Sequence, residues 1–313
     1  MEYARRRVVW SEIFQLSLDT WLSVQRQLVG RITSNVEIYL SQDRLARALR
    51  RLPENLGVYD LWLRGENLLL RWSAQAEDEA ENLFERAIAG DPSFAPAYAS
   101  LASVYNSRLF IRPGIVLPAE TADRAMELAK RAVELDPLDA RNLMAVAFSA
   151  AMTKRFEQSD LHFELASQLN PNDPKVVVSA ALGLSYMGQL GLAKKLLEHA
   201  LSLATFLPAY LWSHVATIRF LMGDYAGTVE AAERSQYVIV DTPGWKAAAL
   251  GKLGRLEERQ VAIEELQRAV GAAWTGPCAA SPDEIMRWFV HVFPIRHDSD
   301  RQKLAKALGH QDN

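Results

Sequence analysis

A helical segment that recurs along the chain limits the available folds more than any other feature of the sequence. Four copies align on an alanine, and in three of them Asp-Pro or Asn-Pro follows four residues later. The aligned residues are Ala87, Ala132, Ala166 and Ala200, which are 45, 34 and 34 residues apart. The period is therefore 34 residues, with an 11-residue insertion in the second unit near 108–118. A unit of this length cannot bury its own apolar face, so the period predicts a stack of repeats.

Each unit has the pattern of two helices joined by a turn. In one unit Leu143, Val146 and Ala150 follow helical spacing, and a second helical stretch ends before Asn170 and Pro171. Proline cannot continue a helix and also restrains the residue before it, so these pairs predict helix ends. Small residues recur where paired helices must approach closely, at Ala102, Ala147, Ala181 and Ala216.

A 34-residue helix–turn–helix period resembles the tetratricopeptide repeat (TPR). The resemblance covers roughly 60–270. It implies an all-α fold, a TPR-type α-solenoid in which antiparallel helix pairs form a right-handed superhelix. We expect five to six units over 57–273, a linker with a long amphipathic helix over 1–56, and capping helices over 274–313. Ser281, Pro282 and Glu284 predict a capping box at the start of a C-terminal helix.

Composition excludes several kinds of chemistry. The 313 residues contain a single cysteine, Cys278, which excludes a disulfide framework and a four-cysteine zinc site. The six histidines form no His-Glu-x-x-His motif or other close pair on one helix face, and the sequence has no phosphate-binding loop motif. We therefore expect no catalytic residues, no metal site and no cofactor.

The charge and hydropathy pattern bears on location and partners. The sequence has no run of about 18 consecutive apolar residues, which excludes a transmembrane helix and predicts a cytoplasmic protein. The net charge of −3 is uneven, because residues 1–56 carry +3 and the remainder −6. Arg44, Arg47 and Arg51 share one helix face, and a solvated linker helix accounts for them. Neither nucleic acid nor a membrane is an expected partner.

A narrower resemblance lies at the start of the repeats. The segments 56–72 and 83–99 are similar to the C-terminal TPR half of bacterial class III adenylate/guanylate cyclases and of winged-helix transcriptional regulators with the same tail. The resemblance implies that 1–56 is a remnant of the α/β segment that precedes the repeats in those proteins. A class III cyclase needs paired metal-binding aspartates on an α/β scaffold, and the sequence before Tyr59 is too short to supply one. Cyclase activity is therefore not expected of this chain.

In TPR proteins the first helix of each unit lines a concave face, and the resemblance assigns ligand-facing positions to this sequence. These positions give a partner-binding groove of Asn106, Arg141, Met144, Phe148, Met152, Lys175, Tyr186, Tyr210, Ser213, Thr217 and Phe220. Methionine and aromatic side chains suit an adaptable peptide groove, and we expect Arg141 and Lys175 to form cationic ends. Phe148 and Leu182 also lie close to packing positions, so the core is an alternative place for part of this set.

These observations favour a non-enzymatic adaptor for protein–protein interaction in bacterial signalling or regulation, with an extended or helical peptide in the groove. The alternative is the regulatory half of a class III adenylate/guanylate cyclase or of a transcriptional regulator. The helix expected over 19–51 offers a surface for a homodimer. The apolar insertion near 108–118 either folds over the edge of the solenoid or contacts a partner, and we favour the first interpretation.

Overall fold

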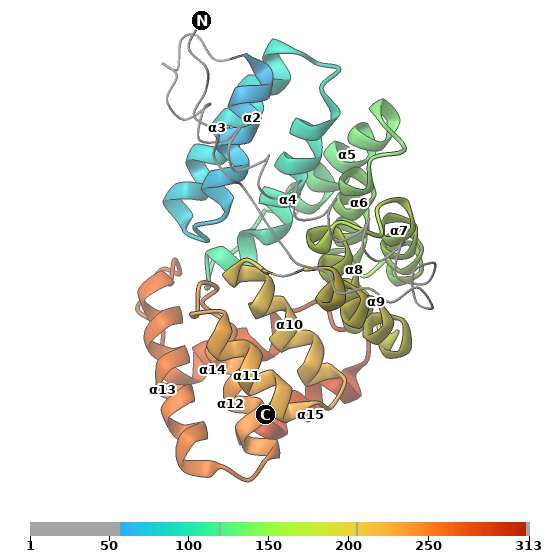
Figure 1. Ribbon diagram of the computed structural model, residues 1–313. Helices are drawn as coiled ribbons and strands as arrows, with labels where there is room; N and C mark the ends of the chain where they lie inside the picture. Colours follow the sequence, from blue (N-terminus) through green and yellow to red (C-terminus); the bar gives the residue numbers. More distant parts are fainter. Residues whose placement is uncertain (1–56, 119, 205, 311–313) are drawn as a thin grey trace, which may run out of the picture.

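The computed structural model describes residues 57–118, 120–204 and 206–310, and every regular element in these ranges is a helix. The helices are α2 (Val58–Leu69), α3 (Ala74–Gly90), α4 (Ala95–Ile111), α5 (Glu120–Leu135), α6 (Ala140–Met152), α7 (Phe156–Leu169), α8 (Pro174–Tyr186), α9 (Leu190–Leu203), α10 (Ala209–Leu221), α11 (Tyr225–Arg234), α12 (Thr242–Lys252), α13 (Leu256–Ala273), α14 (Pro282–His291) and α15 (Asp298–Leu308). Within these ranges, helices α2 to α13 pack as six consecutive pairs that stack into a solenoid (Figure 1). The predicted all-α TPR-type solenoid is confirmed.

Two expectations concern the chain's ends and its hydropathy. Residues 1–56, with the helix and the homodimer surface expected over 19–51, lie outside the described residues. Among the helices that are described, none combines the length and the apolar character needed to cross a membrane.

The repeated sequence signals lie at the helix ends. Helix α5 ends at Leu135 and α7 ends at Leu169, each directly before its Asp-Pro or Asn-Pro pair. The next helix then begins after an aspartate, Asp139 for α6 and Asp173 for α8. Each of these carboxylates accepts a hydrogen bond from the backbone amide two residues later, at 2.9 and 2.8 Å. The local sequence therefore both stops one helix and starts the following one.

The aligned alanines mark the places where helices touch. Ala87, Ala132, Ala166 and Ala200 are all completely buried. A glycine provides a still closer approach in α8, since a Cβ atom on Gly183 would lie 2.1 Å from the ring of Phe163 in α7. Larger side chains at such positions would force the helices apart, so the small residues set the spacing of the stack.

The C-terminal helices cover the last pair of the stack. The predicted capping box is confirmed: the Glu284 backbone amide donates to Ser281 Oγ at 3.2 Å, and the Ser281 amide donates to the Glu284 carboxylate at 2.8 Å. Trp245 of α12 is completely buried beneath the rings of Phe289 and Phe293, with centroid distances of 5.4 and 4.7 Å. Helix α15 also packs against α12. An aromatic cluster therefore joins the C-terminal segment to the solenoid.

The insertion in the second unit packs onto this C-terminal segment. Helix α4 continues to Ile111, so the first part of the insertion is an extra helical turn. The carbonyl oxygen of Pro113 accepts a hydrogen bond from the Thr275 amide at 2.8 Å. Trp288 Nε1 donates to the carbonyl oxygen of Leu109 at 3.2 Å. These contacts agree with an insertion that folds over the edge of the solenoid.

A second contact crosses the solenoid at the turn between α2 and α3. Trp72 adopts a left-handed backbone conformation with φ of 47°. Its ring lies 6.4 Å from that of Tyr210 and 6.2 Å from that of His214, both in α10. A non-glycine residue costs about 1–2 kcal/mol in this region, so the position of the indole depends on the tertiary contact.

Candidate functional site

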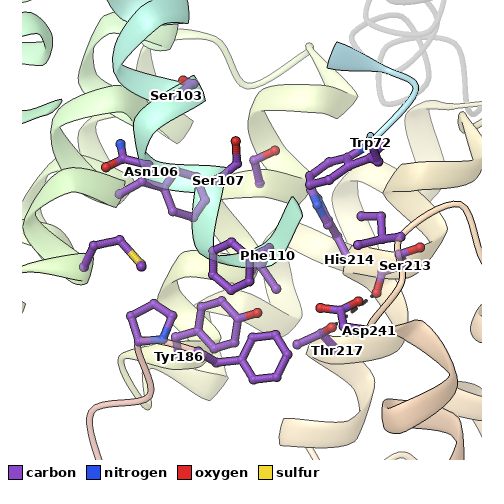
Figure 2. A pocket seen from close by; sticks show the side chains of 17 residues that line it. Trp72, Ser103, Asn106, Ser107, Phe110, Tyr186, Ser213, His214, Thr217 and Asp241 are labelled. Atoms are coloured by element: carbon purple, nitrogen blue, oxygen red, sulfur yellow. Dashed lines mark hydrogen bonds between the residues drawn. The ribbon is translucent and has the colours of Figure 1, made fainter. Parts of the chain in front are cut away.

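Two adjoining cavities lie on the face formed by the first helices of the units. The larger has a volume of about 180 Å³ and is lined by residues of α4, α6, α8 and α10, by the α2–α3 turn, by the segment between α11 and α12 and by the segment after α14 (Figure 2). The smaller, of about 130 Å³, is lined by residues of α2, α4, α6 and α8. Ser103, Phe148 and Ser179 line both. The two cavities therefore adjoin at these three residues, and together they are called the groove. We refer to the larger as the aromatic cavity and to the smaller as the ion-pair cavity.

Aromatic rings from distant parts of the chain form the walls of the aromatic cavity. Trp72 comes from the first unit, Phe110 from the end of α4 and Phe148 from α6. Phe293, from the segment after α14, stacks on both Phe110 and Tyr186 with centroid distances of 5.8 and 5.9 Å. The C-terminal segment therefore supplies one wall of a site that the helical repeat leaves open.

Three ionisable side chains line the aromatic cavity, namely Tyr186, His214 and Asp241. Burial raises the pKa of the Asp241 carboxyl to about 7. Burial lowers the pKa of His214 to about 4, so its imidazole is neutral at pH 7. Burial also raises the pKa of Tyr186 well above its ordinary value. Within the described residues, the buried Nδ1 atom of His214 has no hydrogen-bond partner.

The ion-pair cavity is built around paired charges. Lys175 Nζ lies 3.1 Å from Glu66 Oε2, and Arg141 is 2.5 Å from the carboxylate of Asp139. Burial raises the pKa of Glu66, but Lys175 and the hydroxyl of Ser100 outweigh this effect and bring it below its ordinary value. The carboxylate of Glu66 raises the pKa of Lys175. Arg141 and Lys175, which the sequence analysis predicts as the cationic ends of the groove, each pair with a carboxylate of the same chain.

The structure brings nine of the eleven sequence-predicted groove residues to the two cavities. The aromatic cavity contains Asn106, Phe148, Met152, Tyr186, Ser213 and Thr217, and the ion-pair cavity contains Arg141, Met144, Phe148 and Lys175. Tyr210 lines neither cavity and packs beside the first, against Trp72 and His214. Phe220 lies in the core, 5% exposed, between Tyr225 and Trp245. It lies in the last turn of α10, where the helix faces α12.

Several residues of the aromatic cavity were missed by sequence reasoning, and four of them bear on its chemistry. Trp72 lies in an interhelical turn, Phe293 follows a capping helix, and His214 falls between two assigned groove positions. Asp241 precedes Thr242 in the degenerate sixth unit. An Asp-Thr-Pro run is a helix-start signal, and it is the one sequence feature that marks Asp241 as the beginning of another first helix.

The remaining histidines and the cysteine lie apart from the groove. His162 Nδ1 is 2.7 Å from the Gln158 carbonyl oxygen, and His199 Nε2 is 2.9 Å from that of Pro171. Cys278 is exposed. Across residues 57–118, 120–204 and 206–310, no three His, Cys, Asp or Glu side chains are grouped so that they could hold a metal ion.

The repeat period, the paired helices and the face formed by the first helices define a TPR-type solenoid module. The general role of this class is protein–protein interaction, and its members are typically non-catalytic. No family model matches the chain. One curated relative is putative adenylate cyclase 3 of Rhizobium meliloti (strain 1021), which is 23% identical over 152 residues. The match covers 49% of this chain and 26% of that protein. The chain therefore corresponds to about a quarter of the length of this relative.

Among solved structures, one with a TM-score above 0.5 supports the fold. The monomeric mutant of IFIT1 in complex with Gppp-AAAA superposes with a TM-score of 0.56 at 13% identity, covering 94% of this chain and 69% of that one. A tetratricopeptide repeat protein from Parabacteroides merdae gives a TM-score of 0.47 at 11% identity, covering 87% of this chain and 100% of that one. At these identities the likeness concerns the fold.

Proposed function

We propose that this chain is a non-enzymatic cytoplasmic adaptor that binds an extended peptide segment of a protein partner in its groove. The observation that carries the proposal is the junction of the two cavities at Ser103, Phe148 and Ser179. The junction makes a path along which successive residues of one peptide contact both cavities. Small cavities of this kind suit individual side chains of an extended peptide, and aromatic walls supply most of the binding energy in such anchors.

The side chains along the groove support this role. Phe148 and Met152 are only half-buried, although the cavity is mostly apolar. Exposed apolar surface with a few hydrogen-bonding groups is typical of binding sites. Asn106, Ser213 and Thr217 supply such groups beside the aromatic walls.

Blocking the junction tests the proposal. Peptides would first be selected from a random display library on the immobilised full chain, and their Kd values measured for the wild type and for Ser103→Trp and Ser179→Trp. We expect each bulky indole to weaken binding at least tenfold. Ser202→Trp is the matched control, because Ser202 is exposed on α9, away from the groove. Equal affinity in the junction variants and the wild type, or failure to select any peptide, would overturn the proposal.

A second candidate is a regulatory module of a nucleotide-cyclase signalling system. The partial match to putative adenylate cyclase 3 favours it, because that match covers 152 residues of this largely repetitive chain. In this role too the chain acts by binding and has no catalytic step of its own. Formation of cyclic AMP or cyclic GMP by the purified chain with ATP or GTP and Mn²⁺ would contradict the non-enzymatic assignment. We expect no product above the blank.

A further inference from the structure

The aromatic cavity contains a carboxylate without a compensating cation in its lining. Asp241 is 8% exposed, and among the described residues no lysine or arginine lines the cavity. Figure 2 shows Asp241 and Tyr186 pointing toward one another across the cavity floor, with His214 above them. An ionised carboxylate is costly to bury without a partner, so a ligand that supplies a positive charge has a favourable place here.

The groups that face Asp241 from each neighbouring element do not provide that charge. Helix α8 contributes the neutral hydroxyl of Tyr186, and α10 contributes the neutral imidazole of His214. The segment after α14 contributes Phe293, which cannot ionise. On α12 itself, the ammonium group of Lys246 donates to the Tyr237 hydroxyl at 2.8 Å and lies 3.5 Å from the Glu233 carboxylate.

The walls suit a cation as well. Trp72, Phe110, Phe148 and Phe293 present aromatic rings to the same space. The faces of such rings attract ammonium and guanidinium groups, and their apolar surface accommodates an aliphatic stem. The buried Nδ1 atom of His214, which has no partner among the described residues, adds a polar atom to the lining of the same cavity.

We propose that the aromatic cavity receives a lysine or arginine side chain of the bound peptide, with its charge beside Asp241 and its stem against the rings of Phe110 and Phe293. This inference rests on the proposed peptide-binding function and specifies its anchor. A peptide source is favoured over a free amine because the cavity opens at Ser103 and Phe148 into the ion-pair cavity, which leaves room for neighbouring residues. In the ion-pair cavity, Lys175 and Arg141 already pair with the carboxylates of Glu66 and Asp139. A second cationic side chain of the peptide would therefore find no unpaired carboxylate of this set.

Binding should then depend on pH through Asp241. Burial raises the pKa of its carboxyl to about 7. A cationic side chain binds the ionised form, which is a minor species at pH 6 and the main one at pH 8. The affinity should therefore rise about tenfold from pH 6 to pH 8 and change little above it.

The probes are four acetylated and amidated pentapeptides, Ala-Ala-X-Ala-Ala, in which X is lysine, arginine, norleucine or glutamate. Their Kd values are measured on the full chain by NMR titration. We expect the lysine or arginine peptide to bind at least tenfold more tightly than the norleucine peptide. Asp241→Asn should reduce this preference to less than twofold and abolish its pH dependence. Asp123→Asn is the matched control, because Asp123 is exposed on α5.

The outcomes separate this inference from the function on which it rests. Peptides that bind equally whatever the residue X, and lose affinity in Ser103→Trp, leave the proposed function intact and overturn the cationic anchor. A preference for lysine that persists in Asp241→Asn also overturns it. Binding of free n-pentylamine as tightly as the lysine peptide overturns the peptide source. Absence of binding by all four peptides, while a display-selected peptide still binds, overturns the inference and leaves the proposed function intact.

Discussion

The ring of Phe293 stacks on that of Tyr186, with centroids 5.9 Å apart and ring planes 22° from parallel. Tyr186 is the last residue of α8, whereas Phe293 follows α14, so the contact joins the middle of the solenoid to its C-terminal segment. The backbone amide of Arg296 adds a hydrogen bond of 2.9 Å to the carbonyl oxygen of Tyr186. One short segment therefore both forms a wall of the aromatic cavity and fixes its own position against α8.

Removing the Phe293 ring should lower the stability of the whole protein. Phe293 is 2% exposed and contacts four other aromatic rings, so Phe293→Ala should reduce the free energy of unfolding by about 3–5 kcal/mol. Urea denaturation measures the change. Phe206→Ala removes a ring that is 62% exposed and should change the stability by less than about 0.5 kcal/mol. Similar losses in both variants would show that Phe293 has no special packing role.

The close approach of α7 and α8 predicts opposite effects for two glycine substitutions. A Cβ atom at Gly183 would lie 2.1 Å from the ring of Phe163, whereas one at Gly191 would meet no atom within 4 Å. Gly183→Ala should destabilise the fold by about 1–3 kcal/mol, because the buried ring has little room to move. Gly191→Ala, in α9, should stabilise it by about 0.5 kcal/mol. Thermal denaturation of the two variants would contradict this account if both melting temperatures moved in the same direction.

The buried carboxylate of Glu77 depends on an arginine of the insertion. Arg112 Nε donates to Glu77 Oε2 at 2.6 Å, and the Glu77 side chain is completely buried. Arg112→Met leaves this charge without its nearest partner and should reduce the free energy of unfolding by about 3 kcal/mol. The exposed Arg131 beside Glu134 offers a matched Arg131→Met control, with an expected loss below about 1 kcal/mol.

A paired substitution checks the cause. Arg112→Met combined with Glu77→Gln removes the stranded charge and should recover part of the loss. A double variant as unstable as the sum of the single variants would show that the ion pair has no energetic coupling.

His214 should make the protein less stable in acid. Its pKa is about 4 in the folded protein, below the ordinary value of 6.5 that it takes in the unfolded chain, so the unfolded chain binds a proton first as the pH falls. The stability due to the neutral imidazole is present above pH 6.5 and is lost as the pH falls toward 4, by at most about 1.4 kcal/mol per pH unit. His214→Gln should remove this dependence, whereas His199→Gln on the exposed side of α9 should retain it. Urea midpoints at pH 7.5 and 5 measure the difference, and parallel curves for wild type and His214→Gln would contradict the assignment.

Asp241 should have the opposite effect. Its pKa rises from 3.8 to about 7 on folding, so the folded state retains the proton over this range. Stability due to the protonated carboxyl is present below pH 3.8 and is lost as the pH rises to about 7. Relative to the wild type, Asp241→Asn should therefore gain about 2 kcal/mol between pH 5.5 and pH 8. A constant difference between the two proteins over this interval would exclude the shifted carboxyl.

The sequence predicts the helix pairs well because the signals that define them are local. Ala132 and Ala166 mark tight helix contacts, and the prolines after them mark helix ends that the structure shows at the same places. Most groove positions follow from the same repeat, since one face of each first helix must point to the concave side. Phe220 is an exception: it was predicted to lie in the groove, but it lies in the core, because the last turn of α10 faces α12.

The cross-solenoid contacts could not be predicted in the same way. Trp72 reaches α10, and Phe293 reaches α8, through contacts that no repeat period encodes. Lys175 pairs with Glu66, which lies 109 positions away in the sequence. The repeat pattern therefore predicts the place of Lys175 in the groove but not the carboxylate with which it pairs. The charges of the groove therefore depend on the superhelical path of the whole stack.

The hydrogen bonds between Trp288 and Leu109 and between Thr275 and Pro113 join residues 179 and 162 positions apart. In a stack whose units touch only their neighbours, the units at either end can unfold without the rest. In this chain the two hydrogen bonds join the end of α4 directly to the C-terminal segment. We therefore expect the groove to widen only when these two hydrogen bonds break, and the units that they join to unfold in a single step.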